Sequence, residues 1–124
     1  MATGKYYRKN LIKLVPKVKP VVYSSLYNRG YKRLLSYTNE KFGVYPALSL
    51  ANDIRKKTAV LPYCYLTHSE CRFIPTKSKM YRTIVVKKFA SILYRIKPTR
   101  IEVLSIYDNS ISPSRISKMR SIKI

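Results

Sequence analysis

Lysine and arginine are the residues of this sequence whose number and spacing point most directly to chemistry. The chain has 26 of them against five acidic residues, so its formal net charge at pH 7 is +21 over 124 residues. Cations at this density repel one another unless a partner neutralises them. The sequence therefore predicts a partner with dense negative charge, either a nucleic acid or an acidic protein.

Seven cations are candidates for contacts to a nucleic acid or another target. They lie on or beside the strands predicted below, or in the basic C-terminal tail: Arg82, Lys87, Lys88, Arg95, Arg100, Arg115 and Arg120. Strand alternation places Arg82 and Lys88 on one face of a sheet, and Arg95 lies on a neighbouring strand. We expect a cationic patch on the concave side of this sheet. A solvated sheet face with lysines at its edge is the simpler alternative.

The two cysteines and the single histidine lie close together, as Cys64, His68 and Cys71. A structural zinc ion takes four ligands, and the sequence has no second pair to complete such a set. His68 has no serine, cysteine or aspartate arranged around it as in a catalytic triad. We therefore predict a loop with two free thiols, and we assign no metal, no cofactor and no catalytic residue.

Two amphipathic helices are predicted to position these groups. The first starts near Leu26, ends at Gly43 and has these residues on one face: Tyr27, Tyr31, Leu34, Leu35, Thr38 and Phe42. The second starts at Pro46 and has this apolar face: Ala47, Leu50, Ala51, Ile54, Thr58 and Leu61. With a loop of about three residues between them, the helices must form an antiparallel hairpin.

Strands are predicted on both sides of this hairpin. Residues 18–25 form a β-branched and aromatic run, and residues 80–88, 90–97 and 100–108 alternate as three consecutive strands. Ser112 and Pro113 predict the start of a short tail helix. The order β-α-α-β-β-β-α indicates an α+β domain in which a helical hairpin packs on a small antiparallel sheet.

The N-terminal residues 1–17 are predicted to be a flexible basic arm, and residues 18–124 a single domain. No apolar run approaches the roughly 18 residues that a membrane span requires, and the N-terminus lacks the apolar core of a secretory signal. We expect a cytoplasmic protein with neither a membrane nor a small-molecule partner.

The ordered set of elements and residues resembles the RelE/ParE superfamily of toxins from bacterial type II toxin–antitoxin systems. The similarity covers about residues 21–116 and is strongest at Tyr81-Arg82, at residues 93–96 and at residues 101–108. The helices are similar too, at Leu34, Tyr37, Phe42-Gly43, Ala47 and Leu61-Pro62. The resemblance implies the same fold and an acidic antitoxin whose disordered tail folds onto the grooves of sheet and helices.

The family's ribonuclease branch uses clustered cations to cut messenger RNA on the ribosome. Arg82 matches one such position, but Ile84, Ser91 and Ser110 stand where further cations are expected. RNA cleavage needs a base for the 2′-hydroxyl proton and cations that stabilise the phosphorane. The sequence is therefore more similar to the ParE-like branch, which implies non-enzymatic inhibition of a target such as DNA gyrase. The alternative is a basic RNA-binding structural protein, such as a ribosomal or organellar ribosomal component.

Overall fold

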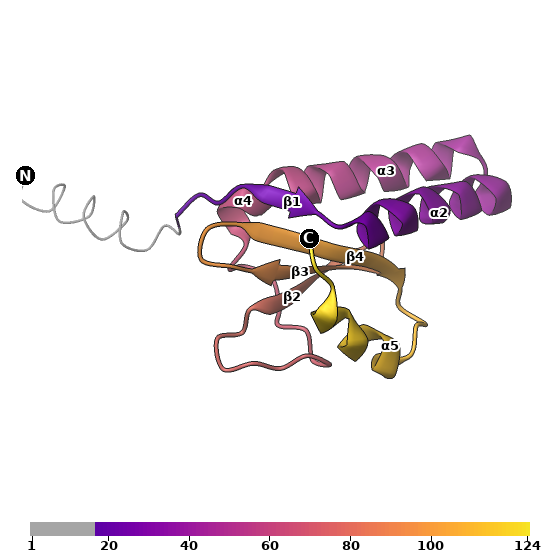
Figure 1. Ribbon diagram of the computed structural model, residues 1–124. Helices are drawn as coiled ribbons and strands as arrows, with labels where there is room; N and C mark the ends of the chain where they lie inside the picture. The colour runs from indigo at the N-terminus through magenta and orange to yellow at the C-terminus, as the bar shows by residue number, and fades with distance from the viewer. Residues whose placement is uncertain (1–16) are drawn as a thin grey trace, which may run out of the picture.

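The computed structural model describes residues 17–124, so the predicted arm lies outside the described residues except for Lys17. Figure 1 shows the elements, which follow in this order: β1 (Val21–Tyr23), α2 (Ser25–Phe42), α3 (Val44–Ala59), α4 (Leu61–Cys64), β2 (Tyr81–Val86), β3 (Ala90–Ile96), β4 (Ile101–Asp108), α5 (Pro113–Lys118) and a 3-10 turn (Met119–Ser121). The order predicted from the sequence is confirmed.

The helical hairpin is bounded by residues suited to helix ends. Ser24 caps α2: its Oγ accepts a hydrogen bond from the Tyr27 N–H at 2.9 Å and donates one to the carbonyl of Leu104. Gly43 ends α2 with a φ of +96°, a left-handed conformation that disfavours side chains. Because α3 begins at the next residue, one glycine joins the two helices. The predicted hairpin is confirmed, with a shorter connection than expected.

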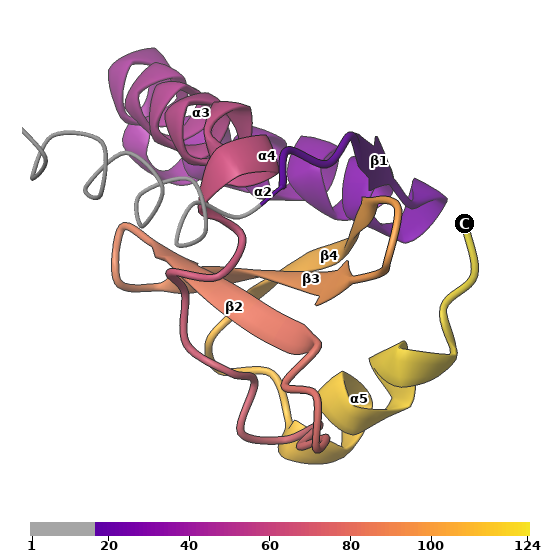
Figure 2. The same ribbon diagram turned by 90° about the vertical axis from the view of Figure 1, so that its left-hand side faces the viewer.

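The sheet has four strands in the order β1-β4-β3-β2. The three C-terminal strands form the predicted antiparallel meander, and β1 joins it at the edge, parallel to β4. The helical hairpin covers one face of the sheet, whereas α5 and the segment between α4 and β2 lie on the other side (Figure 2). The predicted α+β fold, with a helical hairpin on the sheet, is confirmed, but the sheet is mixed rather than wholly antiparallel because β1 is parallel to β4.

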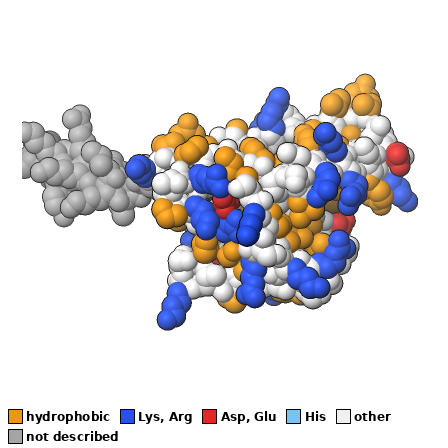
Figure 3. All heavy atoms as spheres, viewed as in Figure 1, with side chains coloured by type: hydrophobic (Ala, Val, Ile, Leu, Met, Phe, Trp, Pro, Cys, Tyr) orange, Lys and Arg blue, Asp and Glu red, His pale blue; other side chains and the backbone are white. Residues whose placement is uncertain are grey.

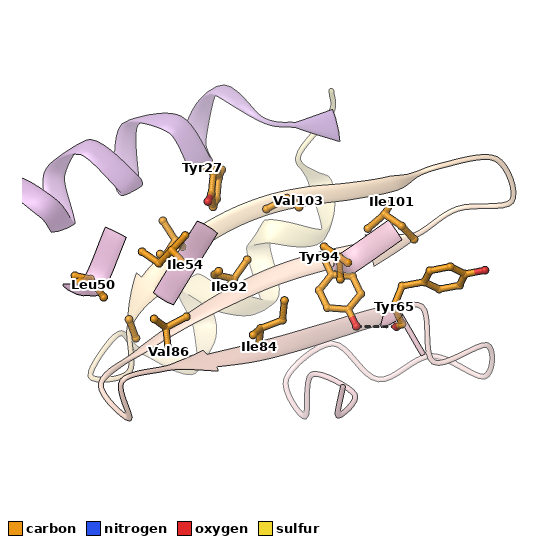
Figure 4. Packing of buried hydrophobic residues seen from close by; sticks show 13 residues of the cluster. Tyr27, Leu50, Ile54, Tyr65, Ile84, Val86, Ile92, Tyr94, Ile101 and Val103 are labelled. Carbon is orange, nitrogen blue, oxygen red and sulfur yellow. Dashed lines mark hydrogen bonds between the residues drawn. The ribbon is translucent and has the colours of Figure 1, made fainter. Parts of the chain in front are cut away.

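The main core fills the space between the hairpin and the sheet. Every second residue on these strands faces the buried sides of the helices, as Figure 4 shows for Ile84, Val86 and Ile92 beneath Ile54 of α3. Tyr94 is fully buried, and its hydroxyl donates a hydrogen bond to the carbonyl of Tyr65 at 2.7 Å. This bond ties the segment after α4 to the centre of the sheet.

A second core lies on the other face of the sheet. Tyr81, Leu93 and Leu104 pack there against Cys71 and Ile74 of the connecting segment and against Ile116 of α5. A β-bulge between β3 and β4 shifts the register at Leu93/Tyr94, so that Leu104 joins this second core while Ile106 returns to the main one. Both faces of the sheet are therefore covered.

Gly30 permits the close approach of α2 to the sheet. A Cβ at this position would lie 2.9 Å from the carbonyl oxygen of Ile106 on β4. Backbone atoms cannot yield as a flexible side chain would, so any larger residue must push the helix away from the strand.

We predict that Gly30→Ala lowers the free energy of unfolding by about 1–3 kcal/mol, because it overpacks this contact. At an exposed helical position the same exchange would instead raise stability by roughly 0.5–1 kcal/mol. Urea denaturation shows whether the free energy of unfolding falls or rises in this variant. Ser36→Ala, on the exposed side of α2, is the matched control and should change stability by less than about 0.5 kcal/mol. A stabilising Gly30→Ala would contradict the close contact.

Candidate functional site

A groove of about 580 Å³ runs between α2 and the C-terminal segment; we refer to it as the α2–α5 groove. Its apolar lining comes from three separate parts of the chain: Leu26, Leu34 and Tyr37 of α2, Ile106 of β4, and Ile111 and Met119 near α5. Leu26 and Tyr37 are 36% and 52% exposed, so part of this lining is open to solvent. An apolar floor of this kind suits the hydrophobic face of a partner segment.

Three arginines line the same groove. Arg29 and Arg33 lie one turn apart on α2, Arg115 lies on α5, and all three are exposed. Within residues 17–124 none of them takes part in an ion pair. Figure 3 shows hydrophobic side chains between the helical hairpin and α5, with Lys and Arg side chains beside them. The apolar lining and the three arginines of the groove together fit an amphipathic segment that carries acidic residues. Guanidinium groups bind carboxylates bidentately.

The polar end of the groove is formed after β4. The Asp108 Oδ1 accepts the Ser110 N–H at 2.8 Å, and this hydrogen bonding holds the pKa of Asp108 below its usual range. Burial raises the pKa of the Tyr107 hydroxyl to about 12. A carboxylate of the partner is repelled at Asp108 and attracted at the arginines, which favours one orientation of an acidic segment.

Arg82 is a structural residue in this fold. Its Nε donates to the carbonyl of Lys79 at 3.0 Å, and its Nη1 donates to the carbonyls of Leu66 and His68 at 2.9 and 3.0 Å. These bonds hold both ends of the segment that covers the second core. Sequence matching placed Arg82 as a possible charge stabiliser, whereas the geometry shows a guanidinium engaged with its own backbone.

Arg95 is buried, with only 7% of its surface exposed. Its guanidinium pairs with Glu102 at 2.6 Å and donates hydrogen bonds to the carbonyls of Arg120 and Ile122 at 3.1 and 2.9 Å. Arg100 donates from Nε to the same Glu102 carboxylate at 2.9 Å. Arg95 on β3 and Arg100 just before β4 were both predicted to bind a target. Both are instead engaged in one intramolecular network around Glu102.

The predicted cationic patch shared by Arg82, Lys88 and Arg95 is wrong. Arg82 is opposite Tyr94 in the register and Arg95 is opposite Tyr81, so the two guanidinium groups lie on different faces of the sheet. Lys88 lies in the β2–β3 turn rather than on a strand face.

The other candidates lie at separate places on the surface. Lys87 and Lys88 are exposed in the β2–β3 turn, Arg115 lines the α2–α5 groove, and Arg120 is exposed on the 3-10 turn. Sequence reasoning missed the role of Arg29 and Arg33. Their spacing of four residues beside Leu26 and Leu34 is the signal that could have revealed them, but a solvated helix face shows the same pattern.

A second groove, of about 690 Å³, lies between α2 and α3. Tyr23, Tyr27 and Tyr31 form a row along it, with ring centroids 5.1 and 6.1 Å apart. Its arginine, Arg55, donates a hydrogen bond to Asn52 at 2.5 Å. The α2–α5 groove has three arginines without an acidic partner among residues 17–124, whereas this second groove has one.

The cysteine-containing segment shows no ligand arrangement for a metal. Cys64 and Cys71 are free thiols, and His68 lies edge-on to the ring of Tyr94 at 6.0 Å between ring centroids. In the described part of the chain, no three side chains of His, Cys, Asp or Glu come together as a possible metal site. Over the same residues, no helix combines the length and apolarity needed to cross a membrane.

Comparison with known proteins supports the fold. No protein-family model matches the chain, and no curated protein matches it. A solved structure described as "Chromosomal ParDE TA system from P. aeruginosa" is similar, with a TM-score of 0.60 and 16% sequence identity. The alignment covers 75% of this chain and 98% of that one. At this identity the likeness establishes the fold, and the chain has the RelE/ParE fold.

We predict that Arg95→Ala lowers the free energy of unfolding by about 3–5 kcal/mol, because it leaves the buried Glu102 carboxylate without its one buried cationic partner among residues 17–124. Arg100→Ala is the matched control: its side chain is 39% exposed, and Arg95 still neutralises the acid, so the loss should be smaller. Chemical denaturation of both variants tests this. Equal losses of unfolding free energy in the two variants would contradict the conclusion that Arg95 contributes more to the network than Arg100 does.

The same network predicts a loss of stability in acid. Burial alone would raise the pKa of Glu102, but hydrogen bonds and charges from Arg95 and Arg100 outweigh it and hold the pKa below the usual value. The resulting stability is complete above the unfolded pKa near ~4.3 and is lost as pH falls through the lower folded pKa. Urea midpoints measured between neutral pH and about pH 3 should fall for the wild type. For Glu102→Gln the urea midpoint should depend less on pH. The same pH dependence in this variant and in the wild type would contradict the assignment of the acid effect to Glu102.

Proposed function

We propose that the chain is the toxin of a type II toxin–antitoxin pair and that an acidic antitoxin neutralises it in the cytoplasm. The observation that carries the proposal is the arginine-lined apolar groove on a RelE/ParE fold. The similar solved structure is described as a ParDE toxin–antitoxin system, which supports a partner of this kind. The likeness gives no support to the alternative, a structural RNA-binding protein.

The charge of the chain favours an acidic partner. The net charge is +21, and Arg29, Arg33 and Arg115 lie free of ion pairs in the described part of the chain. A disordered acidic segment that folds into the α2–α5 groove would bury apolar residues on Leu34 and Met119 and place carboxylates against the arginines. Coupled folding of this kind suits a regulated complex. The conformational entropy that the segment loses on folding lowers the affinity of the complex.

We further propose that the toxin acts by binding, as in the ParE-like branch, on a nucleic-acid-associated target such as DNA gyrase. Arg82 is engaged with backbone carbonyls and Arg95 with Glu102, so neither guanidinium is free for a phosphorane. Ile84 lies in the main core and Ser91 is buried, where its hydroxyl donates to Asn109 at 2.6 Å. Electrostatic stabilisation of RNA cleavage requires such cations to face the substrate.

Induced expression in a bacterial host tests the proposal. Colony counts should fall, messenger RNA should stay intact, and purified chain should slow supercoiling by purified gyrase. Unimpaired growth would contradict the toxin role. Cleavage of messenger RNA at the ribosome would replace the ParE-like assignment with a nuclease, and Arg82→Ala would then show whether that residue contributes.

The groove is tested by antitoxin rescue. Coexpression of a small acidic protein encoded beside this chain should restore growth. Arg33→Glu combined with Arg115→Glu should abolish rescue while the chain stays toxic, because each lost charge-assisted hydrogen bond costs about 1.5–3 kcal/mol of binding. Arg55→Glu with Arg72→Glu makes the same change of charge outside the groove. Rescue that survives the groove variant, or fails equally in the control, would overturn this site.

A further inference from the structure

The turn between β2 and β3 has an unusual sequence for its backbone conformation. It comprises Lys87, Lys88 and Phe89, and the two lysines have φ values of +52° and +65°. In this left-handed region the Cβ of an L-residue approaches a carbonyl oxygen, at a cost of roughly 1–2 kcal/mol per residue. Asn-Gly is the pair that tight hairpin turns normally favour. The geometry of the turn therefore gives no reason for two lysines.

Asn109, in the connection after β4, holds this turn in place. Its Nδ2 donates to the carbonyl of Lys88 at 3.1 Å, and its backbone N–H donates to the carbonyl of Phe89 at 2.8 Å. Its Oδ1 accepts the hydroxyl of Ser91 at 2.6 Å. The backbone of the turn is thus fixed on β4, while both lysine side chains remain exposed.

No acidic side chain neutralises the turn among the described residues. The three ion pairs there involve Asp53 and Glu102, and neither Lys87 nor Lys88 takes part. Phe89, the third residue of the turn, is 41% exposed. Two ammonium groups and a partly exposed aromatic ring thus lie in one three-residue turn at the end of the sheet.

We propose that the Lys87–Lys88 turn binds the phosphate backbone of single-stranded nucleic acid, independently of the α2–α5 groove. Ammonium groups contact phosphates without regard to sequence, and their binding releases counter-ions. The exposed ring of Phe89 offers a surface on which an unpaired base stacks.

A variant that improves the turn while it removes the charge gives a sharp test. Lys87→Asn with Lys88→Gly places residues that tolerate a positive φ at both left-handed positions, so the melting temperature should hold or rise. Fluorescence anisotropy with a labelled single-stranded DNA of about 20 nucleotides would measure affinity at several salt concentrations. Affinity should fall on the order of tenfold, and the slope of log affinity against log salt should become shallower by about 1.4 for two lost contacts.

The matched control is Lys77→Asn with Lys79→Gly. It removes two exposed lysines before β2, at the opposite end of that strand, and Lys79 is also left-handed with a φ of +53°. This control should change the slope by clearly less than the turn variant. Lys87→Gln with Lys88→Gln removes charge without new turn residues and should reproduce the loss. Equal losses in turn and control variants, or no binding by the wild type, would overturn the proposal.

Discussion

The buried ion pair between Arg95 and Glu102 is the interaction on which the C-terminal half of the structure depends. Both side chains are almost fully removed from water, at 7% and 3% exposure, so each charge must be satisfied inside the protein. Arg95 meets this demand with Glu102 and with the carbonyls of Arg120 and Ile122. The pair therefore fixes the chain that follows α5. One wall of the α2–α5 groove is therefore held in place by charges buried on the face of the sheet that α5 covers.

The elements of the fold were predictable because each helix buries one face and the apolar residues of the strands alternate. Tyr27 and Leu34 repeat at helical spacing, and they meet the sheet from α2. Ile84 with Val86 and Ile92 with Tyr94 alternate, and these residues form the floor of the main core. The spacing of apolar residues in the sequence shows which side of an element is buried, and this spacing differs between helix and strand. The family resemblance added the arrangement of these elements.

The positions of the functional groups were not predictable, because they depend on register and on contacts between distant segments. Whether Arg82 and Arg95 share a face is decided by the pairing set at the Lys87–Phe89 turn. The groove needs α2 beside α5, and Arg29 looks in sequence like any solvated helix residue. Residues 62–79 carry no periodic signal, yet Cys71 and Ile74 cover the second face of the sheet.

The pairing of β1 with β4 has a consequence for the order of folding. Ser24, at the end of β1, bonds to the carbonyl of Leu104, so the contact closes a loop of 80 residues. Contacts this distant in sequence form late, because chain entropy must be lost before they are gained. During synthesis β1 must wait until β4 has been made, and the groove must wait for α5. A nascent chain thus acquires the groove only after α5 has left the ribosome.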